Sequence, residues 1–424
     1  MMSDTDFIKR HRLKQSAFTR SRKLNFKTLI TFLLNHRKGA MQTELDAFFK
    51  AQLDQDQPQR QITKSACIQA RKHLAYEAFI ELNHDFIDSL YASNSHALKR
   101  WHGHRVCAVD GSQMRLPREV ALEEKFGCQS GVSGEAKQPM GLVSVYYDVL
   151  NKLVLDAQLV ETRESERYCA TEHLAAVSKD KDLTLYDRGY NAFWFYAYHQ
   201  ELERAFCMRA RVMRDNLARD FVQSEQAEAL ITYTPNRNSR LQCEEMNLSD
   251  QPITLRLIRV DLPGETEVLI TNLIDQKRYP AHEFKRLYHL RWGIEEFYKR
   301  LKHHQEVENL SGKSVLVIMQ DFHAKILAGN LTAALALAGQ RHLDKSLDAK
   351  KVSYQINLSQ AFAKMKQYQV KVWMLSGVTL SRYLSALVQL FSQFKEQVRP
   401  DRSFPRTMTK FNKRRYWMHY KCTL

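Results

Sequence analysis

Three carboxylates stand at places in the chain where they could share divalent metal ions. Asp110 ends a strand-like segment that starts at Arg105, and Asp187 ends a second such segment that starts at Leu183. An aspartate at the end of a buried strand is costly unless a cation accompanies it. Glu295 follows later, in a segment with helical periodicity. Two metal ions held by these side chains, about 3.5 to 4 Å apart, would activate an attacking oxygen and stabilise a leaving oxygen in phosphodiester transfer.

A stripe of aromatic and charged residues surrounds the third carboxylate. It consists of Tyr288, Arg291, Glu295 and Lys302. Spacings of three, four and seven residues line these side chains along one face of a helix, which we predict as a single element over 287–302. Apolar residues on the adjacent face would press that helix onto a core. Such a stripe suits a metal-bound phosphate, whereas an ordinary surface helix would carry the same residues as simple ion pairs.

The four residues of the stripe match a known motif. Together with the surrounding run Arg-Trp-Gly-Ile-Glu-Glu-Phe, they resemble the Tyr-Arg-Glu-Lys signature of one class of DDE transposases, the cut-and-paste enzymes of bacterial insertion sequences. Stretches that begin at Phe18, Ser65 and Glu308 are also similar to this family, so the resemblance covers nearly the whole chain. It implies a DNA transposase that binds terminal inverted repeats and catalyses metal-dependent strand cleavage and strand transfer by a two-metal mechanism.

The resemblance also implies cofactors and partners. Two divalent ions, Mg²⁺ or Mn²⁺, are expected, because hard cations prefer carboxylate oxygens. Asp110 and Asp187 would hold one ion, and Asp110 and Glu295 the other. The implied partner is double-stranded DNA, both the element ends and the target, and the DNA complex is expected to contain a homodimer.

Basic residues supply the predicted DNA contacts. The resemblance places Tyr288 and Arg291 on phosphates near the terminal nucleotides, where the forked guanidinium would bind bidentately. Arginines at the edge of a core are also common without any ligand, so a structural role is the alternative for those outside the stripe. Glu296 and Asp182 are expected to be solvated carboxylates outside the metal site. The predicted contacts are Tyr288, Arg291, Lys299, Lys302, Arg188, Arg209, Arg211, Arg71 and Lys72.

One position departs from the family pattern. Relatives often carry a tryptophan near the end of a β insertion, where it stacks on a flipped base during hairpin formation. No tryptophan occurs here between Trp194 and Trp292. Either Tyr233 or Trp292 would then take the stacking role, or a different intermediate is used. The sequence therefore leaves the hairpin step open.

The composition agrees with a nucleic-acid partner. Lys and Arg total 64 against 47 Asp and Glu, and this net charge of +17 favours a polyanion, although ribosomal and membrane-surface proteins share it. A length of 424 residues and 44% hydrophobic content exclude a disordered basic chain. Seven cysteines without a Cys-x-x-Cys pair argue against a disulfide framework and a structural zinc site. With no export signal, membrane span or small-molecule substrate implied, we expect a bacterial cytoplasmic protein associated with the nucleoid.

Charge and periodicity predict a helical DNA-binding domain over residues 1–100. Residues 9–38 carry ten Lys or Arg and no acid. Arg71 and Lys72 lie on a segment of helix-turn-helix length, for which groove reading and a solvated basic face are equal alternatives. The predicted helices lie near 26–37, 41–53 and 64–80.

Residues 101–305 are predicted as an α/β catalytic domain of ribonuclease-H-like type. The order is three strands, a helix, a strand, a helix and a strand, which places Asp110 on a central first strand and Asp187 at the end of the neighbouring fourth. Between about 212 and 273 the helical pattern disappears, and alternating segments predict a β insertion that delays the helix of Glu295. The core strands are predicted at 105–110, 141–149, 152–160, 183–187 and 205–211.

The rest of the chain is predicted to be helical and then basic. Residues 306–398 have one apolar face, which by resemblance pairs two subunits across two DNA ends; the alternative is that it only covers its own subunit. Residues 399–424 form a tail with eight Lys or Arg against one acid, either a DNA contact or disordered chain. Two alternatives to a transposase remain: a ribonuclease-H-like metal-dependent DNA nuclease without strand transfer, and an inactive DNA-binding relic.

Overall fold

The computed structural model describes residues 1–35, 39–129, 138–212, 216–346 and 353–398. The predicted basic tail, 399–424, lies outside these residues. The chain divides into two compact units, each assembled from segments that are separated in sequence. The first unit comprises Met1–Asn83, Met114–Gly141 and Lys299–Leu424, and the second comprises His84–Gln113 and Leu142–Tyr298.

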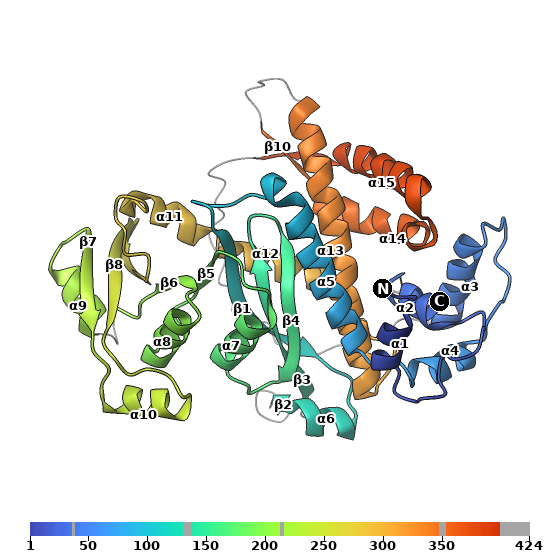
Figure 1. Cartoon of the computed structure of the whole chain (residues 1–424), viewed down its shortest axis with the longest axis horizontal. Helices are drawn as coiled ribbons and strands as arrows, with labels where there is room; N and C mark the ends of the chain where they lie inside the picture. The colour runs from blue at the N-terminus through green and yellow to red at the C-terminus, as the bar shows by residue number, and fades with distance from the viewer. Residues whose placement is uncertain (36–38, 130–137, 213–215, 347–352, 399–424) are drawn as a thin grey trace. The chain divides into compact units, whose positions relative to one another are not determined.

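The second unit is built around a mixed β-sheet (Figure 1). Among the described residues, nine strands form one sheet in the order β2-β3-β1-β5-β6-β9-β8-β7, with β4 paired to β3. Every residue of β3 and β5 is buried, as expected for strands that other elements cover on both faces. The core strands are β1 (Arg105–Arg115), β3 (Gln138–Asp148), β4 (Leu153–Glu161), β5 (Asp182–Tyr186) and β6 (Ala205–Arg209).

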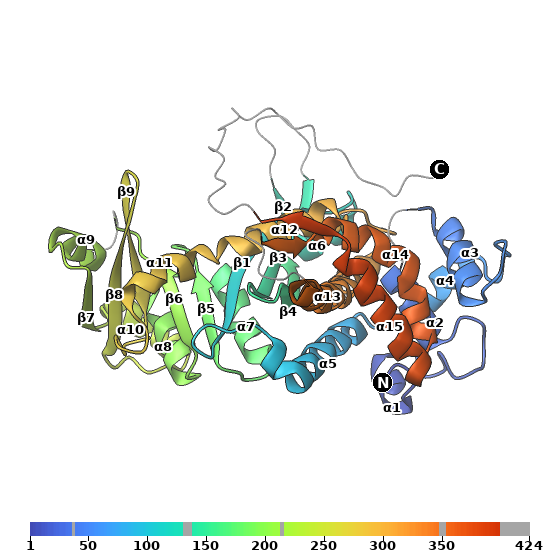
Figure 2. The ribbon, with the colours of Figure 1, turned by 90° about the horizontal axis from the view of Figure 1, so that it is seen from above.

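Helices cover both faces of these strands. Figure 2 shows α7 (Glu166–Ala176) and α8 (Phe193–Glu201) on one face and α12 (Trp292–His303) on the other. The predicted order of strands and helices is confirmed. A short helix, α6 (Val120–Phe126), and a short strand, β2 (Cys128–Gln129), come between the first two core strands and were not predicted.

The register of β1 and β5 brings the two aspartates together. The strands are parallel neighbours, and Ala108 lies opposite Leu185. Continued by two residues, this register places Asp110 opposite Asp187. Asp187 directly follows β5, as predicted, but Asp110 is not at the end of a strand. β1 runs on to Arg115, and what changes at Asp110 is burial, which is complete before it and mostly partial from it onward.

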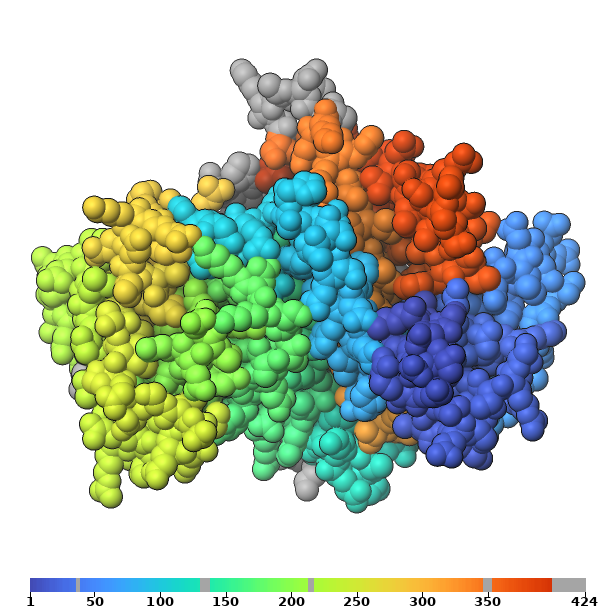
Figure 3. Space-filling view, in the orientation of Figure 1, coloured from blue at the N-terminus to red at the C-terminus, as the bar shows by residue number. Residues whose placement is uncertain are grey.

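The insertion extends the same sheet instead of forming a separate one. Its strands β7 (Glu228–Tyr233), β8 (Ile253–Leu262) and β9 (Glu265–Thr271) are joined by antiparallel pairing, and β9 pairs with β6. The expectation that helices are absent from this stretch was wrong. Two helices, α9 (Asn216–Gln223) and α10 (Arg237–Glu245), lie within it, in the green-to-yellow part of the space-filling view (Figure 3).

The predicted single helix over 287–302 is two helices. The first, α11 (Ala281–His289), ends just before Leu290, and α12 begins at Trp292. Between them the backbone N–H groups of Leu290 and Arg291 donate to the carbonyls of residues three positions earlier, at 3.0 Å each. This is the tighter 3₁₀ pattern, which interrupts the α-helix without reversing the chain. Spacings of three and four residues fit both arrangements, so the sequence could not reveal the interruption.

The N-terminal part of the first unit is helical, as predicted. Its helices are α1 (Thr5–His11), α2 (Phe26–Asn35), α3 (Met41–Gln52), α4 (Lys64–Arg71) and the start of α5 (Glu77–Asn94). The predicted helix over 64–80 is divided between α4 and α5. The segment between them pairs with the chain after α1, because the Leu13 N–H donates to the His73 carbonyl at 2.8 Å and the Ala75 N–H donates to the His11 carbonyl at 2.9 Å.

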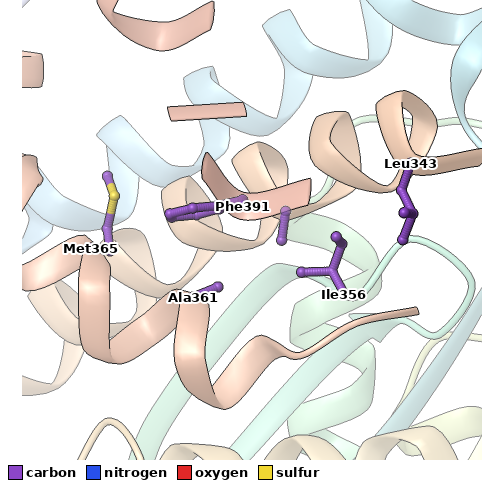
Figure 4. Packing of buried hydrophobic residues seen from close by; sticks show 6 residues of the cluster. Leu343, Ile356, Ala361, Met365 and Phe391 are labelled. Atoms are coloured by element: carbon purple, nitrogen blue, oxygen red, sulfur yellow. The ribbon is translucent and has the colours of Figure 1, made fainter. Parts of the chain in front are cut away.

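The C-terminal part of the first unit packs around a long helix, α13 (Val315–Ser346). A buried cluster joins it to the elements that follow, and Figure 4 shows Leu343, Ile356, Ala361, Met365 and Phe391 facing one another. Within the described ranges, no helix is long and apolar enough to cross a membrane. The following elements are β10 (Tyr354–Ile356), α14 (Leu358–Met374), α15 (Gly377–Ser392) and β11 (Lys395–Gln397).

A buried polar network ties α5 and α7 to the sheet of the second unit. The Asp156 carboxylate on β4 contacts Nδ1 of His173 at 2.6 Å and Nε2 of His84 at 2.9 Å. The other His173 nitrogen lies 3.0 Å from the Ser144 hydroxyl. The residue types are those of a nucleophilic triad, but Ser144 and His173 are fully buried. No substrate reaches them, so the network is structural.

Because of this network, the stability of the fold should depend on pH. Burial by itself would raise the pKa of Asp156, but hydrogen bonds from His173 and His84 outweigh it and hold the pKa well below the ordinary 3.8. The same bond overcomes burial and raises the pKa of His84 above 6.5. The Asp156 contribution is therefore present above pH 3.8 and lost on acidification, and the His84 contribution is present below pH 6.5 and lost as pH rises through its raised pKa.

We expect Asp156→Asn to reduce stability by about 3 kcal/mol near pH 5, the scale for breaking a buried ion pair. Its melting temperature should also vary less with pH than that of the parent, because the linked groups lose their common partner. Thermal melting between about pH 3 and 8 checks this. Melting curves that shift with pH in parallel for the two proteins would contradict the role of Asp156.

Candidate active site

Asp110 is held in place through its own backbone. Its carboxylate accepts a hydrogen bond from the Gly111 N–H at 3.0 Å. The hydroxyl of Tyr298 on α12 donates to the Asp110 carbonyl at 2.7 Å and to the Val143 carbonyl at 3.0 Å. Because Tyr298 is buried, these bonds fix α12 against β1 and β3. The helix of Glu295 is thus anchored directly on the strand that carries Asp110.

Asp187 is positioned by the turn that follows β5. Its carboxylate accepts from the Gly189 N–H at 2.6 Å. A Cβ at Gly189 would lie 2.8 Å from the same carboxylate oxygen, so a larger residue in this turn would displace the Asp187 side chain. Arg167 on α7 donates from Nε and Nη2 to the Gly189 carbonyl at 3.0 and 2.8 Å. The Tyr288 hydroxyl donates to the Tyr186 carbonyl at 3.1 Å and connects α11 to the same strand end.

A fourth carboxylate, Glu166, lies at this place and was not predicted. It is the first residue of α7, and a Cβ added to Gly111 would lie 2.7 Å from its Oε1. The Tyr190 hydroxyl donates to its Oε2 at 3.4 Å. The sequence holds glutamates at 161, 164 and 166, and nothing in their spacing distinguishes the third. Only the position of the helix start relative to β1 reveals it.

These carboxylates repel one another. Burial, followed by the charge of Glu166, raises the pKa of Asp110 to about 7, with Asp187 adding to the effect and Arg291 opposing it. Burial and the charge of Asp187 likewise raise the pKa of Glu166. Excess negative charge in a half-buried place is what a divalent cation would neutralise, and carboxylate oxygens are the donors that Mg²⁺ and Mn²⁺ prefer. Asp110 and Asp187 fit such an ion chemically.

The side chains are not drawn together around a metal centre. Across the described ranges, no group of three or more Asp, Glu, His or Cys side chains is arranged to hold a metal ion. The partner of Glu295 is Arg291, whose Nη2 lies 3.4 Å from Oε1. The positive charge of Arg291 in turn offsets part of the rise in the pKa of Asp110. The structure thus links all three predicted carboxylates electrostatically, with the arginine between Glu295 and Asp110.

Arg291 is largely buried beside two aromatic rings. Its guanidinium carbon lies 4.9 Å from the centre of the Trp292 ring and 5.9 Å from that of Tyr288. The Nε atom is buried and has no hydrogen-bond partner among the described residues. Tyr288 is also buried, whereas Trp292 is 38% exposed. One arginine donor is therefore buried and unsatisfied among the described residues, and the neighbouring indole is partly exposed.

The other predicted DNA contacts of this region differ in availability. Arg188 is exposed, and its carbonyl accepts from Nε of Arg211 at 2.7 Å. Arg209 forms ion pairs with both Glu265 and Glu267 of β9. Its charge is thus already neutralised within the protein, which weakens the case for a DNA contact.

Two lysines lie on the C-terminal half of α12. Lys299 is exposed, and Lys302 is half-buried. Burial lowers the pKa of Lys302, while nearby Glu308 acts in the opposite direction. Both residues belong to the first compact unit, whereas α12 up to Tyr298 belongs to the second. Glu296 is exposed, as expected for a carboxylate outside the metal site.

Asp182 was expected to be solvated, and this was wrong. Its side chain is completely buried. Nε of Arg105 lies 2.6 Å from one of its oxygens, and Nη1 of Arg204 lies 2.7 Å from the other. Arg105 is its partner in the β1–β5 register, and Arg204 precedes β6. The aspartate therefore forms ion pairs with two arginines that only the folded sheet brings together.

Arg71 cannot serve as the predicted groove-reading residue in this structure. Its side chain is 2% exposed and forms an ion pair with Asp321 at 2.9 Å. It also donates to Gln320 at 2.9 Å and to Ser311 at 2.5 Å. The guanidinium therefore holds α4 against α13 within the first unit. Lys72, the next residue, is exposed.

Comparisons with known proteins place these observations in context. Residues 101–331 match the family model described as the transposase DDE domain. The chain is 22% identical over 366 residues to the transposase InsG of insertion sequence element IS4 from Escherichia coli (strain K12), covering 84% of this chain and 78% of that protein. It also aligns with the cryo-EM structure of the piggyBac transposase synaptic complex with hairpin DNA. That alignment has 9% identity and a TM-score of 0.44 and covers 91% of this chain and 82% of that one.

Proposed function

The chain belongs to the transposase DDE domain family and is a DNA-cleaving, strand-transferring enzyme, and from this premise we propose that it is a cut-and-paste transposase of the Tyr-Arg-Glu-Lys class. Its catalytic domain is then a ribonuclease-H-like core. The observation that carries the proposal is the parallel pairing of β1 with β5, whose register, continued by two residues, places Asp110 opposite Asp187. Glu295 follows on a helix that Tyr298 bonds to the Asp110 backbone.

The divalent ions of this reaction would be held by the three carboxylates. Asp110 and Asp187 would hold one ion, and Asp110 and Glu295 the other. When bound, two such ions lower the pKa of the attacking hydroxyl and stabilise the leaving oxygen. Asp110 has the raised pKa expected of a carboxylate that lacks its cation. The attacking groups are water in the cleavage step and a DNA 3′ hydroxyl in the transfer step.

Arg291 is suited to hold a DNA phosphate at this site. Its buried Nε has no partner among the described residues, while its Nη2 contacts Glu295. A phosphate oxygen would satisfy that donor, and the planar guanidinium can present two donors at once. The Tyr288 hydroxyl donates to the Tyr186 carbonyl, so this side chain helps to hold α11 in position. We therefore assign Tyr288 a positioning role and Arg291 the phosphate contact.

The N-terminal domain would bind the element ends. A pocket of about 470 Å³ lies between α4 and the segment after α1, and none of its lining residues is acidic. Arg20 and Arg22 line it and are exposed, with no ion-pair partner among the described residues. Phe18 also lines it and adopts a left-handed backbone with φ 58°, an uncommon conformation that is enriched at functional sites. Charge and an aromatic wall suit a nucleotide with its phosphate.

Replacing Arg20 and Arg22 by alanine should weaken binding to the element ends and lower the salt dependence by about one unit of slope for each lost phosphate contact. Lys23→Ala is the control for each single variant, Arg20→Ala and Arg22→Ala, because it also removes one nearby positive charge. Lys23 is hydrogen-bonded to Gln61 at 2.8 Å and does not line the pocket. Binding measured by fluorescence anisotropy between about 50 and 200 mM salt tests this. Equal slopes for the single variants and the control would contradict the pocket's role.

Two further features complete the proposal. Two subunits would hold two DNA ends together, with α13, α14 and α15 as the pairing region. The enzyme would act in the bacterial cytoplasm at the nucleoid. Its other proposed DNA contacts are the basic segment 399–424, the exposed Lys72, Arg188 and Lys299, and the half-buried Lys302.

A defined excision assay tests the function. The protein is incubated with Mg²⁺ and a plasmid that carries a marker between the element's own terminal repeats, together with a target plasmid. We expect release of the marker by double-strand breaks at both ends and its insertion into the target. Cleavage without any joined product would instead identify a nuclease, and an intact plasmid would contradict catalysis altogether.

A further inference from the structure

Glu166 belongs to none of the motifs that identify the family, yet it faces the Asp110 strand. Its carboxylate occupies the space above Gly111, where an added Cβ would lie 2.7 Å from Oε1 and 2.9 Å from the carboxyl carbon. Gly111 directly follows Asp110 in the chain. The glycine therefore makes room for the glutamate, and the glutamate borders the backbone that carries the first aspartate.

The surroundings of Glu166 contain no compensating cation. It has no salt-bridge partner in the part of the chain that the structure describes, and its hydrogen bond comes from the neutral Tyr190 hydroxyl at 3.4 Å. The residue that donates this bond, Tyr190, also belongs to the Asp187 turn, because its N–H donates to the Asp187 carbonyl at 3.3 Å. The Glu166 side chain is only half-exposed. A carboxylate in that position is costly unless a cation is bound nearby.

The placement of α7 makes this contact a built feature of the fold. Glu166 is the first residue of that helix, and the next residue, Arg167, anchors the helix start on the Gly189 carbonyl. The same carbonyl belongs to the turn that positions Asp187. The helix start and the aspartate turn are thus tied to each other by the backbone of one glycine. Glu166 is thereby kept beside both aspartates.

We propose that Glu166 is the fourth carboxylate of the site and a third ligand of the divalent metal ion that Asp110 and Asp187 hold. The inference rests on the proposed metal-dependent function and adds a ligand to its metal site. Oxygen donors from three side chains would neutralise a divalent cation more completely than two would, and Mg²⁺ and Mn²⁺ accept such ligands. Gly111 then serves the metal site by leaving the space that this third donor occupies.

Direct Mn²⁺ binding tests the proposal without relying on catalysis. The full-length protein is titrated with Mn²⁺ up to millimolar concentration, and free Mn²⁺ is followed by its electron paramagnetic resonance signal. We compare the parent with Glu166→Gln, with Asp110→Asn, and with Glu164→Gln as the matched control. Glu164 is exposed, and its carboxylate accepts only from the adjacent Ser165 N–H at 2.9 Å among the described contacts. The expected loss of affinity for Glu166→Gln is roughly 10- to 100-fold, with Glu164→Gln unchanged.

Thermal melting separates a ligand from a structural residue. Without metal, Glu166→Gln should melt at the same temperature as the parent or higher, because a repelling charge is removed. With saturating Mn²⁺ the parent should gain stability and the variant should gain much less. A structural role for the Tyr190 contact would instead lower the melting temperature of the metal-free variant, and that result would overturn the proposal.

The outcomes also distinguish the proposal from the function on which it rests. Equal Mn²⁺ affinity for Glu166→Gln and the parent, with a clear loss for Asp110→Asn, would overturn only the role of Glu166. Mn²⁺ binding that Asp110→Asn does not weaken would count against the metal site itself. Weakened binding by Glu166→Gln and Asp110→Asn, with normal binding by the control, would support both.

Discussion

Replacing Asp110, Asp187 or Glu295 by alanine is expected to abolish strand cleavage while binding to the element ends remains measurable. Each carboxylate contributes to holding ions that stabilise transition-state charge by several kcal/mol, so the loss in rate should be on the order of 10³-fold or more. DNA positioning depends on different side chains, which are untouched by these changes. Cleavage of end-labelled DNA in Mg²⁺, together with gel-shift binding, measures the two properties separately.

Glu296→Ala is the matched control for this series. Glu296 is adjacent to Glu295 on α12 but is exposed, so we expect near-normal cleavage. Near-normal activity of Asp187→Ala would contradict the proposed metal site. An inactive Glu296→Ala protein beside an active Glu295→Ala protein would show that the assigned helix position is wrong by one residue.

Arg71→Ala should destabilise the first unit by about 3 to 5 kcal/mol, the range for removing one partner of a buried ion pair. The loss would leave the Asp321 carboxylate buried without its cation, and the two side chains are only 2% and 5% exposed. The hydrogen bonds from Arg71 to Gln320 and Ser311 would disappear as well. Chemical denaturation of the full-length protein, followed by a probe in the first unit, measures the effect.

Lys72→Ala provides the contrast at the neighbouring position. Lys72 is exposed at the end of α4, so its loss should change stability by less than about 0.5 kcal/mol. Any effect of Lys72→Ala should appear in DNA binding instead. A stable Arg71→Ala protein with weakened DNA binding would restore the groove-reading interpretation of Arg71 that its burial contradicts.

The strands that carry the candidate aspartates could be predicted because their sequence pattern is strong. The sequences that form β1 and β5 contain short apolar runs followed by turn residues, and their short length and flanking glycines favour strands over buried helices. Asp110 could be predicted beside Asp187 because the order of strands and helices is ribonuclease-H-like, and that order places the fourth strand next to the first. The position of each aspartate within its strand was less accessible. β1 continues past Asp110 because residues 111–115 keep pairing after their burial becomes mostly partial.

The roles of several charged residues could not be predicted, because their partners are distant in sequence. Arg71 meets Asp321 across 250 residues, and Asp182 meets Arg105 across 77. Nothing local separates such a buried pair from a solvated charge. Glu166 escaped notice for the same reason, since its contact with Gly111 exists only after α7 packs against the sheet. The periodicity of a sequence shows which residues share one face of a helix or strand. It does not show which residues pack against that face.

The interruption between α11 and α12 changes the electrostatic position of the motif. In one continuous helix, Glu295 would lie near the middle, where the backbone dipoles largely cancel locally. Because α12 begins at Trp292, Glu295 falls in its first turn and Lys302 in its last. The exposed N–H groups of a helix start carry partial positive charge, and the carbonyls of its end carry partial negative charge. The seven-residue spacing of the glutamate and the lysine therefore spans the two ends of one short helix dipole, and each charge lies at the end that stabilises it.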